Sequence, residues 1–197
     1  GVCRHDLLPI TEPVSVSQAI DDLPRIRSKL SKNDSIEAWR EAVLAAPSYV
    51  SGWGTPSEQT VIELMRNSAH TATWTGVGKP FAQKSGRKPK PSEQSELQRW
   101  VNDRDLDGIC QHEARSHMPS DLARYLFAAC FAQLNRYSPR LDIFPSNLLP
   151  MHSNVTKERD GTKAIPFKDR FRVQCANYPA TTIVSHIAKD GHYYIHY

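Results

Sequence analysis

The chain has 197 residues, which is long enough to bury a hydrophobic core without a disulfide or a structural metal. Its 39% hydrophobic and 23% charged residues are ordinary for a soluble globular protein. There is no run of the ~18 apolar residues that a membrane span needs, and no signal-peptide pattern. The net charge of +4 is only mildly basic, and the four cysteines form no CxxC pair, so we expect reduced thiols inside a cell.

Both ends are expected to be boundaries within a longer polypeptide. The chain begins Gly1-Val2-Cys3 without a methionine and stops inside an aromatic run, Tyr193–Tyr197. A β-like stretch that stops there leaves unpaired backbone groups and apolar side chains. We therefore expect further chain on each side.

The first part of the chain predicts short elements and then a helix. Residues 1–30 are expected to form a strand, a proline-rich connector and a brief helical turn over Val16–Leu23. Asp34, with Glu37 three residues later, resembles a capping box that opens a helix ending near Ala46.

Two further helices carry stronger signals. Thr55-Pro56-Ser57-Glu58 combines a cap, a proline at the first helical position and a returning glutamate, for a helix to about Asn67. Pro119–Leu134 is apolar nearly all round, which is typical of a helix at the centre of a domain. The residues expected to face inward in the first of these helices are Val61, Leu64 and Met65.

The stretch Thr71–Ser92 contains no acidic residue and is rich in glycine and proline, which predicts a mobile loop. It is either a DNA arm that contacts phosphates or an ordinary solvated loop. A helix is expected from Ser92 to about Asn102, and a strand over Ile109–Glu113. The possible phosphate contacts of the basic stretch are Lys79, Lys84, Arg87, Lys88 and Lys90.

After Pro139 the pattern changes to aromatic and β-branched segments separated by turn formers. The expected strands are Phe171–Cys175, Thr182–Ile187 and His192–Tyr197, with Asp190-Gly191 as a hairpin turn. The predicted fold class is α+β, with a largely helical part (31–138) followed by a small antiparallel β unit in a β-rich part (139–197).

Common catalytic motifs are missing from the sequence. There is no glycine-rich phosphate loop and no GxSxG elbow. Cys110, His112 and His117 do not have a zinc-site spacing by themselves, and His192 and His196 on one strand would lie about 13 Å apart. No metal site is predicted, and a metal-dependent nuclease is the less favoured alternative.

Basic residues gather before the late strands. Between Lys157 and Arg172 the sequence has six basic and three acidic residues. Polar side chains follow, and arginine or lysine suits guanine edges while glutamine or asparagine suits adenine. The alternative is a sheet edge protected by positive charge. These polar side chains are Gln174, Asn177, Thr181, Thr182, Ser185, His186 and Lys189.

Two runs, Phe167–Gln174 and Pro179–His196, closely resemble the bacterial DNA (cytosine-5) methyltransferases, at the end of their target-recognition domain. Val14–Pro24 resembles the segment after the arginine-containing motif of that family, and Gly1–Leu7 the strand before it. Arg115–Tyr125 is similar to the longer bacterial members. The resemblance implies that residues 1–30 end a catalytic-domain strand and its connector, and that residues 31–197 are the recognition domain.

The resemblance also implies a DNA-facing surface. In this family the recognition domain lies across the DNA cleft from the catalytic domain and presents loops to the major groove. Thr182-Ile183 stands where the family has a threonine followed by leucine or isoleucine, and Thr182 would support the backbone near the flipped cytosine. The candidate DNA-binding residues are Lys168, Arg170, Arg172, Gln174, Thr182, Ile183, Ser185, His186 and Lys189.

The catalytic parts of that family are absent from this sequence. No cysteine follows a proline, and the Glu-Asn-Val, FxGxG and late Gly-Asn motifs are missing, so the chain by itself is expected to be inactive. The cofactor S-adenosylmethionine would belong to the catalytic domain of the parent restriction-modification enzyme. The expected partners are that domain and double-stranded DNA, in the cytoplasm at the nucleoid. A standalone DNA-binding module without a catalytic partner is the alternative.

Overall fold

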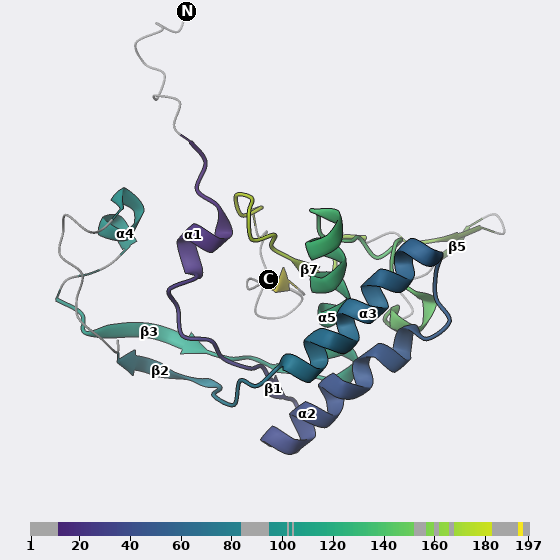
Figure 1. Ribbon diagram of the computed structural model, residues 1–197, viewed down its shortest axis with the longest axis horizontal. Helices are drawn as coiled ribbons and strands as arrows, with labels where there is room; N and C mark the ends of the chain where they lie inside the picture. The colour runs from purple at the N-terminus through teal and green to yellow at the C-terminus, as the bar shows by residue number, and fades with distance from the viewer. Residues whose placement is uncertain are drawn as a thin grey trace, which may run out of the picture.

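Helix α5 (Pro119–Asn135) lies at the centre of the fold (Figure 1). Leu122, Phe127, Ala128 and Phe131 are all buried, so the helix is packed on several sides, as its apolar sequence predicts. The fold is seen in a computed structural model, which describes residues 12–83, 95–101, 103, 105–151, 157–159, 162–165, 168–182 and 193–194.

Two helices and a 3-10 helix pack against α5: α2 (Ile36–Ala45), η2 (Ala46–Val50) and α3 (Pro56–Thr71). The predicted capping box of α3 is confirmed, because Thr55 and Glu58 cap each other's backbone and Pro56 opens the helix. Val61 and Met65 are buried and Leu64 is partly buried, also as predicted.

Helix α2 begins one residue later than predicted, and the reason is an ion pair. Ser35, and not Asp34, caps α2 by accepting a hydrogen bond from the backbone N–H of Ala38 at 3.0 Å. The carboxylate of Asp34 instead accepts hydrogen bonds from both terminal nitrogens of the buried Arg27, at 2.7 and 3.1 Å, and from the N–H of Leu30 at 2.8 Å. A bidentate pair with a guanidinium outweighs one cap hydrogen bond.

An antiparallel ribbon projects from the helical part and is formed by β2 (Gly78–Gln83) and β3 (Gly108–Glu113) (Figure 1). The strand predicted over Ile109–Glu113 is confirmed, but the loop predicted for Thr71–Ser92 is wrong over Gly78–Gln83. Pro80 is tolerated because each strand of a two-stranded ribbon needs hydrogen bonds on one side only. Helix α4 (Glu96–Val101) lies near the far end of the ribbon.

The base of the ribbon is tied to the chain that follows α1 (Val16–Ile20). The N–H of Arg27 donates to the carbonyl of Gly76 at 2.8 Å, and its Nε donates to the carbonyl of Thr75 at 3.2 Å. Two short strands, β1 (Lys29–Leu30) and β4 (Ser116–His117), then pair in parallel where the ribbon meets the helices. One buried arginine therefore joins the ribbon to the start of α2.

The late part of the chain holds short strand pairs, and the α+β class is confirmed. Strands β5 (Lys157–Arg159) and β6 (Thr162–Ala164) are antiparallel. Strands β7 (Arg172–Val173) and β8 (Tyr193–Tyr194) are parallel, so the antiparallel direction expected there is wrong for this pair. Parallel pairing requires a long return of the chain, which a tight hairpin cannot supply. The predicted turn Asp190-Gly191 lies outside the described residues.

Within the described residues, no helix has both the length and the apolar character needed to cross a membrane.

Candidate nucleic-acid interface

The chain before and within β7 is fixed on α5 by a buried aromatic side chain. Phe171 is 2% exposed, its ring lies 5.7 Å from that of Tyr125, and the guanidinium of Arg124 lies 5.0 Å above it. Its φ of +55° is a left-handed conformation that a bulky residue rarely adopts. Such a conformation persists when the surrounding packing determines it. The neighbours Arg170 and Arg172 are partly buried.

Arg124 itself is fixed, so the support under Phe171 is rigid. Its Nη1 lies 2.6 Å from the carboxylate of Asp121, and its Nε donates to the carbonyl of Leu148 at 2.7 Å, at the end of η4 (Ser146–Leu148). Both charges are buried, and the hydrogen bonds and the ion pair compensate their desolvation.

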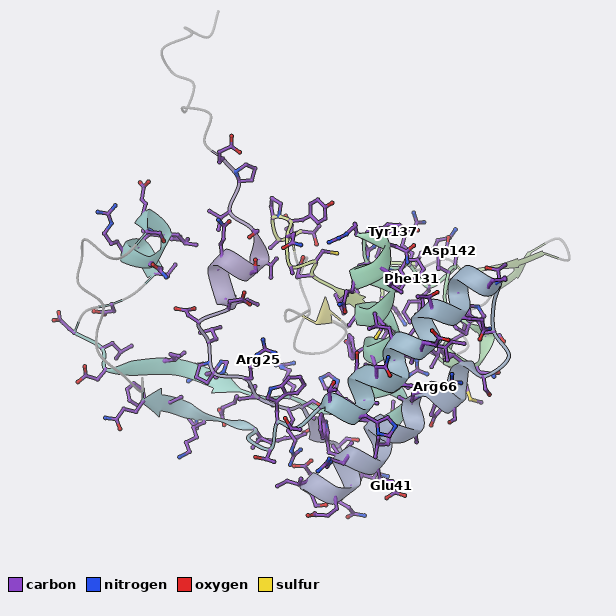
Figure 2. The ribbon with its side chains drawn as sticks, in the orientation of Figure 1. Arg25, Glu41, Arg66, Phe131, Tyr137 and Asp142 are labelled. Atoms are coloured by element: carbon purple, nitrogen blue, oxygen red, sulfur yellow. The ribbon has the colours of Figure 1, made fainter. Side chains whose placement is uncertain are left out.

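Backbone hydrogen bonds hold both sides of Phe171. The N–H of Leu141 donates to the carbonyl of Lys168 at 2.9 Å, and the N–H of Val173 donates to the hydroxyl of Ser138 at 3.0 Å. The segment 168–173 is thereby held along the chain that follows α5. In that chain the ring of Tyr137 lies 5.4 Å from the ring of Phe131, edge-on to it (Figure 2).

The predicted basic residues of this segment lie in a locally positive surface. Residues 136–142 and 168–172 contain five basic and two acidic residues, a local excess of three positive charges. Lys168 pairs with Asp142 at 2.8 Å and Arg172 with Asp169 at 2.8 Å. The ammonium of Lys168 lowers the pKa of Asp142 below its usual value, so Asp142 stays charged at neutral pH. Arg170 is half-buried between these pairs along the chain.

Gln174 does not occupy a base-reading position. Its side chain is 3% exposed, and its amide is taken up by Thr181: Nε2 donates to the carbonyl at 3.1 Å, and Oε1 accepts from the N–H at 3.0 Å. The hydroxyl of Thr181 also donates to Oε1 at 3.2 Å. The adenine contact that we expected from the residue type is therefore wrong, because the Gln174 amide instead closes the loop 174–181. We call this pair of residues the Gln174–Thr181 clamp. Thr182, which is exposed, follows directly after the clamp.

A shallow hollow of about 200 Å³ lies between the end of α5 and this clamped loop. Two tyrosines with exposed side chains line it, Tyr137 (52% exposed) and Tyr178 (49%). The N–H groups of Val16 and Ser17 in α1 donate to the carbonyls of Tyr178 and Ala176, both at 2.9 Å, which steadies the loop wall. The lining residues are Arg136, Tyr137, Ser138, Arg172, Val173, Gln174, Cys175, Tyr178, Pro179 and Thr181.

Arg172 lines the hollow, and not all nitrogens of its guanidinium have a hydrogen-bond partner. Its Nη1 is held by Asp169, whereas its Nε is buried and has no hydrogen-bond partner in the described part of the chain. A buried donor without an acceptor costs about 1–3 kcal/mol, so such an atom calls for a specific explanation.

The remaining predicted site residues are not brought to this surface by the described structure. Lys79 is exposed on β2, in the ribbon that projects away from β7 (Figure 1). Sequence reasoning missed Arg136, Tyr137 and Tyr178, although the pair Arg136-Tyr137 directly after a long helix was a visible signal. Outside the described residues lie Ile183, Ser185, His186, Lys189, Lys84, Arg87, Lys88 and Lys90.

No group of three or more histidine, cysteine, aspartate or glutamate side chains in the described ranges is placed to hold a metal ion. Comparison of the chain with protein-family models, with curated proteins and with solved structures finds no match.

Proposed function

We propose that this chain is the target-recognition segment of a DNA (cytosine-5) methyltransferase and binds double-stranded DNA. The proposed DNA face consists of residues 136–142 and 168–182. The observation that carries the proposal is the rigid positive surface on both sides of Phe171, next to a hollow lined by two arginines and two exposed tyrosines. Arginine, lysine and tyrosine side chains are the usual partners of phosphate and sugar in such complexes.

In this proposal the basic side chains of the surface bind the DNA backbone, and the clamped loop holds Thr182 in place. Lys168, Arg170 and Arg172 provide the positive charge that attracts the phosphate backbone. The Gln174–Thr181 clamp gives the loop one shape, so that Thr182 starts the following segment from a fixed point. A fixed loop loses less conformational entropy on binding than a flexible one.

Methyl transfer itself is assigned to a catalytic domain of the parent polypeptide, which would bind S-adenosylmethionine and act on a flipped cytosine. In this proposal the protein works in the cytoplasm at the nucleoid, as part of a restriction-modification system.

The test is DNA binding by the chain, titrated against salt, for the wild type and three variants. Arg170→Ala and Arg172→Ala each remove a charge from the proposed face, whereas Arg66→Ala removes one from α3, away from β7 (Figure 2). We expect wild-type affinity to fall steeply with salt, and each face variant to bind about tenfold more weakly, while Arg66→Ala binds like the wild type. No affinity at low salt, or equal losses in all three variants, would refute this DNA face.

A further inference from the structure

We infer that the hollow between Arg136, Tyr137, Arg172 and Tyr178 is a subsite for a single phosphodiester of the DNA backbone. This inference rests on the proposed function, since DNA is the source of the phosphate. The ligand chemistry is a phosphate monoanion with an attached sugar.

The size of the hollow favours part of a polymer over a whole small molecule. Its volume of about 200 Å³ is below the range of roughly 300–1,000 Å³ that is usual for pockets that enclose a complete small ligand. A phosphate group with part of its sugar is an occupant of that scale.

The charge of the lining selects an anion. Arg136 and Arg172 come from two different elements, the end of α5 and β7, and among the described residues that line the hollow none is acidic. Asp169, which holds Nη1 of Arg172, is itself 77% exposed and lies outside the lining. Two arginines without an acidic neighbour in the lining match one phosphate better than a neutral or cationic ligand.

The donors and rings of the lining fit a sugar-phosphate unit. Nε of Arg172 is buried within the protein, so the donors that Arg172 offers a phosphate in the hollow are its terminal guanidinium nitrogens, one of which Asp169 already holds. The hydroxyls of Tyr137 and Tyr178 add two further donors, and their half-exposed rings offer apolar faces to a deoxyribose.

The backbone around the hollow is already arranged. Arg136 follows α5 in the left-handed conformation, with φ of +67° and its N–H bonded to the carbonyl of Ala132. The opposite wall is held by the Gln174–Thr181 clamp and by the two hydrogen bonds from α1. The subsite therefore needs little ordering when a phosphate enters.

The first experiment measures how many phosphates each variant contacts. The slope of log affinity against log salt should be smaller by about 0.9 in Arg136→Gln than in the wild type, because one phosphate contact is lost. Arg136→Lys should restore most of the slope, and Arg66→Gln should leave it unchanged. An unchanged slope in Arg136→Gln overturns the subsite while leaving the proposed function standing.

The second experiment places the phosphate in the hollow. Cys175 lines the hollow, and the exposed Cys110 on β3 serves as an internal control in the same molecule. Alkylation of each thiol is followed by mass spectrometry in the presence of duplex DNA, inorganic phosphate or a mononucleotide. We expect duplex DNA to slow alkylation of Cys175 at least fivefold without affecting Cys110, and to have no such effect in Arg136→Gln.

Two other outcomes would overturn the subsite. DNA that binds but leaves Cys175 as reactive as before overturns the subsite alone. Protection by inorganic phosphate or the mononucleotide, without DNA binding, would identify a site for a free phosphate compound and overturn both proposals. Circular dichroism of each variant verifies that the fold is intact.

Discussion

The side-chain amide of Gln174 binds both the N–H and the carbonyl of Thr181, at 3.0 and 3.1 Å, and so closes the loop 174–181 on itself. The side-chain amide thus makes the same pair of hydrogen bonds that a backbone peptide group would make. It forms hydrogen bonds with the N–H and the carbonyl of Thr181, which would otherwise bind water, and its own side chain is buried.

Replacing Gln174 should loosen this loop and weaken DNA binding indirectly. Gln174→Ala removes the three hydrogen bonds to Thr181, each worth about 0.5–1.5 kcal/mol net, and should lower the free energy of unfolding by about 1–3 kcal/mol. Urea titration measures this loss, and DNA titration measures the accompanying loss of affinity. Asn177→Ala, an exposed change in the same loop, is the control for stability, and Arg66→Ala is the control for DNA affinity. Unchanged stability in Gln174→Ala would show that the clamp contributes nothing.

The ion pair of Arg27 and Asp34 should make stability depend on pH in the acid range. The hydrogen bonds from Arg27 lower the pKa of Asp34 below its usual 3.8. A carboxylate with a lowered pKa in the folded state stabilises the fold fully above its unfolded value. That contribution is lost as the pH falls through the lowered pKa.

Asp34→Asn should therefore be less stable than the wild type at neutral pH, by about 3 kcal/mol, because Arg27 is left buried without its anion. The difference between the two proteins should shrink as the pH falls from about 5 to about 2. Unfolding in urea across this pH series measures it. A difference that stays constant with pH would contradict the assignment to this carboxylate.

Gly78 and Gly52 offer a matched pair for testing the ribbon. Both have a left-handed φ, +80° and +79°, but a Cβ at Gly78 would clash with the backbone carbonyl of His112, whereas nothing lies within 4 Å of one at Gly52. Gly52→Ala should cost about 1 kcal/mol from conformation alone. Gly78→Ala should cost more and also speed amide hydrogen exchange in β2 and β3. Equal effects of both substitutions would mean that the ribbon does not pack as described.

The described thiols should differ widely in reactivity. Burial raises the pKa of Cys130 to about 11, and it also raises the pKa of Cys175. Because the thiolate is the nucleophile, Cys130 should resist alkylation at pH 8, Cys175 should react slowly, and the exposed Cys110 should react first. Time-resolved mass spectrometry of the native protein gives the order. Early modification of Cys130 would show that α5 is not packed as a central helix.

Much of the helical part was predictable because its signals are local. The apolar surface of Pro119–Leu134 predicted a central helix, and the caps at Thr55 and Pro56 predicted the start of α3 to the residue. Capping and periodicity depend on neighbours within four residues, so a short window of sequence contains the information. The basic segment at 168–172 was visible for the same reason.

The tertiary structure alone decided the features that join distant residues. Strand β2 forms despite Pro80 and its neighbouring glycines because β3, about thirty residues later, supplies its hydrogen bonds. Gln174 became a clamp because the loop returns Thr181 to it, and the hollow exists because the chain after α5 lies beside β7. Sequence determines which groups are available for such contacts. Long-range packing decides which of these groups come into contact, and composition and periodicity carry no information about that packing.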